Sequence, residues 1–251
     1  MILNIAAYQF VEIADPAALR DRLLARGAAL ALKGTVLVAG EGINVFLAGE
    51  AEPVRVFLAE LTADPRFADM AVKFSESETV PFQRLRVKLK REIITFRNFQ
   101  LLPGRERAPA VAPKQLAQWL EQGRDDAGRE IVLLDTRNDQ EIAHGTFVDA
   151  LTLPIAKFTE LPQALEAHRE SVRGKTVVSF CTGGIRCEKA ALWMQDAGYE
   201  NVLQLEGGIL GYFEQVGGAH YRGGCFVFDE RIALAPDLKP MTSGAMTEAP
   251  A

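Results

Sequence analysis

A buried strand that turns into a glycine-containing loop and then into a helix sets the architecture of the second half of this chain. The strand pattern runs from Thr176 to Phe180, where β-branched and apolar residues predominate, as in a strand covered on both faces. The chain continues through Cys181, Gly183 and Gly184 into a helical pattern from Cys187 to Ala197. A strand followed by a crossover helix predicts an α/β domain with a parallel sheet.

Strand and helix patterns alternate through the rest of this half. Two more apolar runs predict buried strands, Ile131–Leu134 and Val202–Leu205. Helices are expected over Pro113–Leu120, Leu161–His168 and Leu210–Val216. We therefore expect a parallel-sheet domain over residues 114–220 and a C-terminal segment over 221–251, whose last ~15 residues are expected to be disordered.

The first half predicts a second kind of domain. Strands are expected over Ile2–Phe10, Thr35–Val38, Ile43–Leu47 and Met70–Phe74. One helix should begin at Asp15-Pro16 and stop at Gly27, and another should contain Val54 to Leu61. The order βαββαβ predicts a ferredoxin-like α+β domain over residues 1–100, with one further strand over Leu85–Phe96. Residues 101–113, with three prolines, are expected to be a linker.

Composition excludes several other classes of protein. The chain is 48% hydrophobic and 24% charged, which is typical of a globular protein. No apolar run approaches the roughly 20 residues of a membrane span, and the first ten residues do not resemble a signal peptide. Three cysteines without such a signal indicate reduced thiols in the cytoplasm. The three histidines lie far apart and show no zinc-site spacing, so a structural or exposed role is expected for His144 and His220.

Cys181 is the strongest candidate for a reactive residue. It follows a buried strand, at the edge of the sheet where α/β proteins bind ligands. Gly183 and Gly184 allow successive backbone N–H groups to turn inward, and the next helix directs its positive end at the same point. Arg186 adds a full positive charge. These features predict a lowered pKa and a thiolate at neutral pH, and the alternative is a small buried apolar side chain.

A cysteine phosphatase is a rival interpretation of the same loop. Phosphatase loops place five residues between the cysteine and the arginine, whereas only Thr182, Gly183, Gly184 and Ile185 intervene here. A shorter loop makes a smaller cradle, which suits a terminal sulfur atom better than a tetrahedral phosphate.

The residues around Cys181 have two interpretations each. Arg186 either binds an adduct on the sulfur or forms a salt bridge with Asp135 or Glu141. Cys187 either resolves an adduct or packs inward from the first turn of the helix, and inward packing is preferred. Asp135 and Arg137 either contact substrate or form a structural ion pair, and the ion pair is preferred.

The net charge of −5 disfavours coating of nucleic acid by overall charge, but one stretch is strongly basic. In a strand, cations that alternate with Leu85, Val87 and Leu89 share one face at about 7 Å spacing, which suits an RNA backbone. Phe96 and Phe99 would add stacking surface. The alternative is a solvated edge strand protected by its charges. The candidate RNA-binding residues are Arg84, Arg86, Lys88, Lys90, Arg91 and Arg97.

Three motifs resemble those of rhodanese domains, which carry sulfur as a cysteine persulfide. CTGGIR resembles the active loop, DTRN with the downstream Glu141 and His144-Gly145 resembles an earlier motif of the fold, and EGGI resembles its closing turn. Longer runs, KGTVLVAGEGINVFLAG, SFCTGGIRCEKA, LEGGILGYFE and GGCFVFDERIAL, resemble the tRNA uridine hydroxylase family of rhodanese-fold proteins over roughly residues 1–235. Longer family members carry a cysteine-rich segment after the last run, whereas Cys225 stands alone here.

This resemblance implies oxygen-dependent hydroxylation at C5 of the wobble uridine, with Cys181 as nucleophile or persulfide carrier. It implies no recognised metal or flavin cofactor, and O₂ with an unidentified reductant as co-substrates. The implied partner is tRNA through its anticodon loop, and neither DNA nor a membrane; the sequence gives no signal of the oligomeric state. Two alternatives stay open: a thiosulfate-type sulfurtransferase that uses the same loop, and a non-catalytic RNA-binding module, which the intact Cys181 and Arg186 disfavour.

Overall fold

The computed structural model describes residues 1–98 and 106–241. The chain folds into two compact units, Met1–Thr95 and Phe96–Ala251. Residues 101–105 of the expected linker lie outside the described residues, and Ala110–Val111 of that segment forms a strand of the second unit. The disorder expected at the C-terminus falls mainly on residues 242–251, which also lie outside the described part of the chain.

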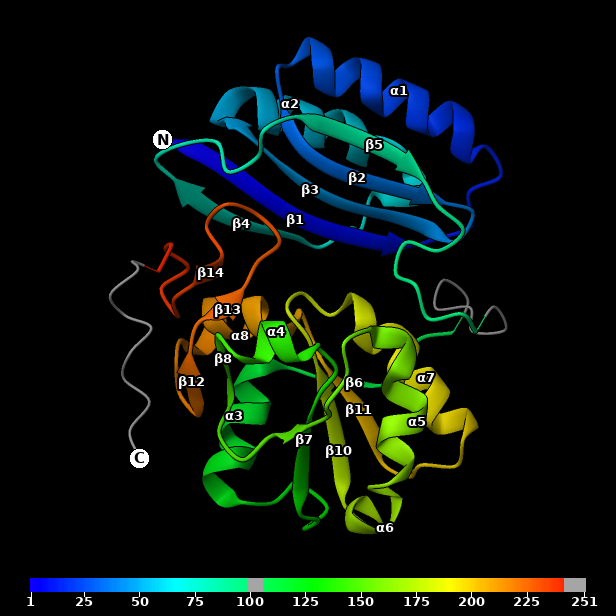
Figure 1. Cartoon of the computed structure of the whole chain (residues 1–251), viewed down its shortest axis with the longest axis vertical. Helices are drawn as coiled ribbons and strands as arrows, with labels where there is room; N and C mark the ends of the chain where they lie inside the picture. Colours follow the sequence, from blue (N-terminus) through cyan, green and yellow to red (C-terminus); the bar gives the residue numbers. More distant parts are fainter. Residues whose placement is uncertain (99–105, 242–251) are drawn as a thin grey trace. The chain divides into compact units, whose positions relative to one another are not determined.

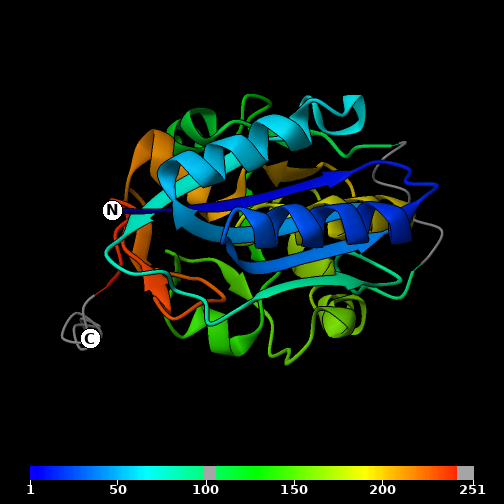
Figure 2. The same ribbon diagram turned by 90° about the horizontal axis from the view of Figure 1, so that it is seen from above.

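The first unit is a ferredoxin-like α+β domain, as the sequence predicts. Its strands have the order β4-β1-β3-β2-β5, and β1 is antiparallel to both β3 and β4. The two helices lie side by side on one face of this sheet (Figure 2). The elements are β1 (Ile2–Phe10), α1 (Pro16–Ala29), β2 (Lys33–Ala39), β3 (Gly42–Glu50), α2 (Ala51–Thr62), a 3₁₀ turn (Pro65–Phe67), β4 (Val72–Ser77) and β5 (Leu85–Leu89).

The first helix does not stop at Gly27, and that expectation is wrong. The helix α1 continues to Ala29, and Gly27 is buried inside it. A Cβ atom on Gly27 would lie 3.0 Å from a methyl carbon of Leu85 on β5. The glycine therefore allows close packing of helix and strand, because it has no side chain to hold them apart.

The expected strand over Leu85–Phe96 is also wrong in its length. The strand β5 pairs in parallel with β2 and ends at Leu89, opposite Val38, one residue before β2 itself ends. With no partner strand left, the chain leaves the sheet, and the backbone N–H of Ile93 donates to the carboxylate of Glu41 at 2.7 Å.

The second unit contains the predicted parallel sheet, with the strand order β6-β11-β10-β7-β9 (Figure 1). The central strand β10 is buried at every position, as its unbroken pattern predicts. The principal elements of the second unit are β6 (Ala110–Val111), α3 (Pro113–Gln122), β7 (Ile131–Asp135), α4 (Asp139–Ile142), β8 (Gly145–Phe147), β9 (Leu151–Thr152), a 3₁₀ turn (Phe158–Glu160), α5 (Leu161–Glu166), α6 (Arg169–Val172), β10 (Thr176–Phe180), α7 (Ile185–Asp196), β11 (Val202–Leu205) and α8 (Gly208–Val216).

The segment after α8 is part of this unit. The strand β12 (Tyr221–Gly223) pairs antiparallel with β8, and β13 (Cys225–Phe226) pairs with β14 (Ala233–Leu234). Tyr221, Cys225 and Leu234 belong to the same apolar core as Phe180. Among the described residues, no helix has the length and apolar character needed to cross a membrane.

Candidate active site

Cys181 follows the last residue of β10, at the carboxyl end of the parallel sheet, as the sequence predicts. The side chain is completely buried, which was expected for the alternative interpretation and not for an accessible nucleophile. The outer part of the loop is less covered, since Gly183 and Ile185 are half-buried. The sulfur therefore lies beneath its own loop and has no direct exposure to solvent.

The surroundings of the sulfur favour an anion. Gly184 adopts a left-handed backbone conformation, with φ of 101°, and its N–H donates to Cys181 Sγ at 3.1 Å. Burial acts against ionisation, but the Cys187 thiol, the Arg186 charge and the backbone N–H groups of Arg186 and Gly184 outweigh it. Together they hold the pKa of Cys181 well below that of an ordinary thiol.

Cys187 is the second thiol of the site. It lies in the first turn of α7, is completely buried as the preferred interpretation requires, and lies 3.8 Å from Thr136 Oγ1. Burial raises its pKa, and the neighbouring Cys181 sulfur raises it further. These opposite pKa directions favour the proton on Cys187 and the negative charge on Cys181.

Arg186 forms the salt bridge that was one of its two expected roles, and its partner is Glu141. The two guanidinium nitrogens Nη1 and Nη2 each donate to one carboxylate oxygen at 2.6 Å, and both side chains are buried. This two-point contact fixes the plane of the guanidinium group. Because the charge of Arg186 also lowers the pKa of Cys181, a structural and an electrostatic role coexist in one residue.

Asp135 and Arg137 form a separate ion pair, with both side chains completely buried and Arg137 Nη2 lying 2.6 Å from an Asp135 oxygen. Thr146 donates to the same carboxylate, and Arg137 also donates to the carbonyl oxygen of Gly145. The pair thus connects the end of β7 to β8. This geometry agrees with a structural ion pair.

The first turn of α8 holds the loop in place. The N–H groups of Ile209 and Leu210 donate to the carbonyl oxygens of Cys181 and Thr182 at 2.9 and 3.0 Å. Gly208, with φ of 61°, lies so close that a Cβ atom there would be 2.5 Å from the Cys181 carbonyl oxygen. Only glycine combines this backbone conformation with this close approach.

The strand β13 contributes to the site, which no motif in the sequence predicts. Thr182 Oγ1 donates to the carbonyl oxygen of Phe226 at 3.4 Å, so this strand lies against the active loop. Burial raises the pKa of the adjacent Cys225 to about 12, which leaves it a neutral thiol. The short apolar run Cys225–Phe228 is compatible with a strand, but nothing in the sequence indicates that it packs against the active loop.

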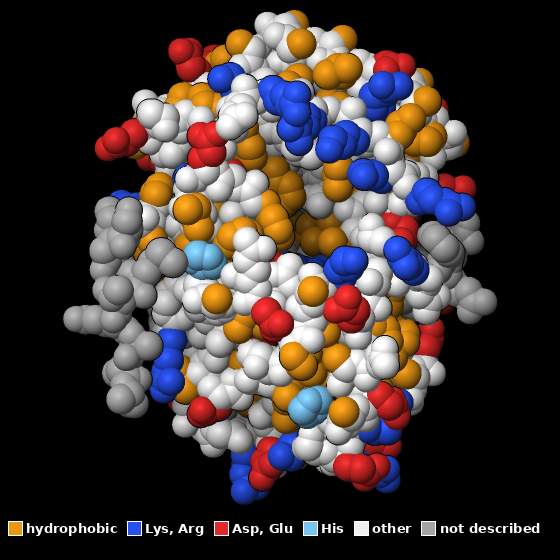
Figure 3. Space-filling view, in the orientation of Figure 1, with side chains coloured by type: hydrophobic (Ala, Val, Ile, Leu, Met, Phe, Trp, Pro, Cys, Tyr) orange, Lys and Arg blue, Asp and Glu red, His pale blue; other side chains and the backbone are white. Residues whose placement is uncertain are grey.

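The six basic candidate residues are all exposed. Only Arg86 and Lys88 lie within β5, on either side of the buried Val87; the other four flank or follow the strand. A band of Lys and Arg side chains covers the region of β5 in Figure 3. The stacking role expected for Phe96 is wrong, because its side chain is buried against Phe158 and Trp193 in the second unit. Phe99 lies outside the described residues.

Within residues 1–98 and 106–241, no three or more His, Cys, Asp or Glu side chains gather in a way that could hold a metal ion. The site consists of a thiolate, two amide donors and a guanidinium group on a loop at the carboxyl end of a parallel sheet. A loop of this kind on this fold defines a rhodanese-like protein.

Comparison with known proteins agrees with the rhodanese-like class and identifies one family within it. Residues 112–215 match the rhodanese-like domain, and residues 2–93 match the UPF0176 acylphosphatase-like domain. The chain is 63% identical to the tRNA uridine(34) hydroxylase of Xanthomonas euvesicatoria pv. vesicatoria (strain 85-10), over 98% of this chain and 100% of that protein. It is 60% identical to the tRNA uridine(34) hydroxylase of Variovorax paradoxus (strain S110), over 99% of this chain and 94% of that protein. The chain belongs to the tRNA uridine(34) hydroxylase family.

Proposed function

We propose that this protein hydroxylates C5 of uridine 34 in tRNA and so forms 5-hydroxyuridine. One observation carries the proposal: the similarity to relatives named for this activity extends over 98% of the chain at 63% identity. The loop supports it, because the sulfur of Cys181 is surrounded by groups that stabilise an anion. We place the reaction in the cytoplasm, where thiols stay reduced.

Hydroxylation needs an oxidant and a reductant. One atom of O₂ becomes the hydroxyl oxygen on C5, the other leaves as water, and a reductant supplies two electrons. We therefore propose O₂ and a reductant as co-substrates and assign the residues of this chain to binding and to activation of the base or the oxygen.

Two routes use the Cys181 thiolate. In the first, the thiolate attacks C6 of the uracil ring, which makes C5 nucleophilic toward an oxidant. Once the C5–O bond has formed, loss of the C5 proton expels the thiolate from C6 and restores the C5–C6 double bond. In the second, the thiolate attacks the sulfane sulfur of a donor such as thiosulfate and releases sulfite, and the persulfide formed on Cys181 then activates oxygen. Both routes need the thiolate at neutral pH, and both need the loop to move, because the sulfur is completely buried.

Nucleoside mass spectrometry of tRNA from the source organism tests the proposal. Deletion of the gene should remove 5-hydroxyuridine from tRNA, wild-type protein should restore it, and Cys181→Ala at equal protein level should not. Full restoration by Cys181→Ala would contradict the role of this sulfur. Unchanged 5-hydroxyuridine after deletion, in cells without a second pathway, would contradict the proposed activity.

A thiosulfate-type sulfurtransferase is the second candidate function, favoured by the match to the rhodanese-like domain. It requires a Cys181 persulfide, formed when the thiolate takes the outer sulfur of thiosulfate and releases sulfite, and that sulfur then passes to cyanide or a thiol. Turnover of thiosulfate by the purified protein, together with normal tRNA in the deletion strain, would favour this function over hydroxylation.

A further inference from the structure

Three aromatic rings lie together beside the active loop and take no part in the site described above. We call His144, Phe226 and Phe228 the aromatic platform. The ring centroids of His144 and Phe226 are 5.2 Å apart, and those of Phe226 and Phe228 are 5.1 Å apart with the rings almost perpendicular. Phe228 is 59% exposed, and the other two rings are half-buried.

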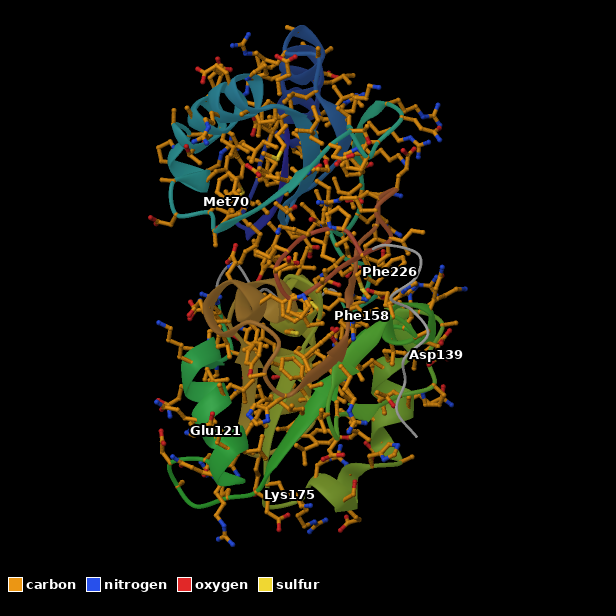
Figure 4. All side chains as sticks on the ribbon, turned by 90° about the vertical axis from the view of Figure 1, so that its left-hand side faces the viewer. Met70, Glu121, Asp139, Phe158, Lys175 and Phe226 are labelled. Carbon is orange, nitrogen blue, oxygen red and sulfur yellow. The ribbon has the colours of Figure 1, made fainter. Side chains whose placement is uncertain are left out.

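Buried neighbours connect the platform to the core of the second unit. Phe226 is the last residue of β13, and Phe228 lies in the turn that connects β13 to β14. Their neighbours Cys225 and Val227 are buried, and the N–H of Val227 donates to the carbonyl oxygen of Ile232 at 2.8 Å across this turn. Figure 4 labels Phe226, which lies at the end of the second unit toward which β7 and β10 run. Phe228 is therefore an exposed ring on a turn that is closed by backbone hydrogen bonds.

Two backbone contacts fix the platform relative to Cys181. The N–H of Gly224 donates to the carbonyl oxygen of His144 at 2.8 Å, which brings the His144 and Phe226 rings together. The hydroxyl of Thr182, the residue after Cys181, donates to the carbonyl oxygen of Phe226. The platform is thus one hydrogen bond away from the loop that carries the reactive sulfur.

Exposed aromatic rings beside a reactive site suit a flat ligand. Single-stranded RNA is recognised largely by stacking of its unpaired bases on Phe, Tyr, Trp and His side chains. A stable protein–protein interface buries an area many times larger than the surface of three rings, so the platform alone is too small for a protein partner. We propose that the aromatic platform receives an unpaired base of the anticodon loop as the target uridine enters the site; this inference rests on the proposed function.

Binding of RNA to the full-length chain carrying Cys181→Ser tests the platform without turnover. The ligand is a fluorescently labelled 17-nucleotide anticodon stem-loop, and its Kd is measured by anisotropy. In this background, Phe228→Leu should weaken binding roughly 5- to 150-fold, because one stacked base is lost. Phe228→Tyr keeps the ring and should bind like the parent. Phe74→Leu, at another exposed phenylalanine on β4, is the matched control and should have no effect.

Stem-loops with a single abasic site at position 33, 34 or 35 identify the base. Against the RNA that lacks the stacked base, parent and Phe228→Leu should bind equally. Equal binding of parent and Phe228→Leu to the intact RNA would overturn the platform and leave the proposed function standing. If Phe228→Leu weakened binding equally on all three abasic RNAs, this result would also overturn the platform and leave the proposed function standing. If the parent does not bind the intact stem-loop at all, the proposed function and this inference both fail.

Discussion

Arg186 combines two electrostatic functions at the scale of a single residue. It neutralises the buried carboxylate of Glu141 through two short hydrogen bonds, and its charge favours the thiolate of Cys181. A buried ion pair that loses one member leaves an uncompensated charge, which costs far more than the pair contributes. Replacing Arg186 alone removes both functions, whereas replacing Arg186 together with Glu141 removes the effect on Cys181 without leaving a buried unpaired charge.

Arg186→Met should raise the pKa of Cys181 toward that of a free thiol, about 8.5. It should also lower the free energy of unfolding by about 3–5 kcal/mol, because Glu141 is left buried and unpaired. The double variant Glu141→Gln, Arg186→Met should recover most of this stability but not the acidic thiol. Urea denaturation and the absorbance of thiolate at 240 nm measure the two effects. A double variant with an acidic thiol would show that Arg186 does not control the pKa.

At the scale of the elements, the active loop depends on the first turn of α8. Gly208 lies against the Cys181 carbonyl oxygen and the Gly184 nitrogen, at distances that no Cβ atom tolerates. Since α8 donates two hydrogen bonds to the same loop, displacement of this turn would also displace the loop.

Gly208→Ala should therefore lower the free energy of unfolding by about 1 kcal/mol through left-handed backbone strain, and by at least about 2 kcal/mol more through the clash of its Cβ with the loop. Gly198→Ala is the matched control, because Gly198 also has a positive φ but open space around it. It should show the strain alone. Equal losses in the two variants, measured by urea denaturation, would mean that the α8 turn does not press on the loop.

Local patterns predicted much of this arrangement, and distant contacts account for what they missed. Thr176–Phe180 and the glycines after Cys181 act through near neighbours in the chain, so both the buried strand and the anion-binding loop were predictable. The burial of Cys181 depends on a turn about 25 residues later, and the approach of Phe226 to Thr182 joins residues 44 positions apart. No periodicity of the sequence encodes such contacts.

At the scale of the whole molecule, the candidate RNA-binding residues of β5 and the reactive cysteine belong to different units. The basic residues of β5 belong to the first unit, and the reactive sulfur belongs to the second. If β5 contacts the RNA backbone, binding and chemistry should respond separately to mutation.

The double variant Arg86→Gln, Lys88→Gln should weaken tRNA binding and lower the salt dependence of log K by roughly one for each phosphate that the variant no longer neutralises. The single-turnover rate at saturating tRNA should stay near that of the wild type. Arg55→Gln, at an exposed cation on α2, is the control. An unchanged salt dependence in the double variant would favour a solvated edge strand over an RNA-binding role.

The most direct test of the whole account is a pH titration of Cys181 in the folded protein. The absorbance at 240 nm of the wild type, minus that of Cys181→Ser, isolates this thiol, because the pKa values of Cys187 and Cys225 are raised. We predict a thiolate that is fully formed at pH 7 and is lost only as the pH falls well below neutrality. A thiol that ionises only above about pH 8.5, as in an unfolded chain, would contradict the account.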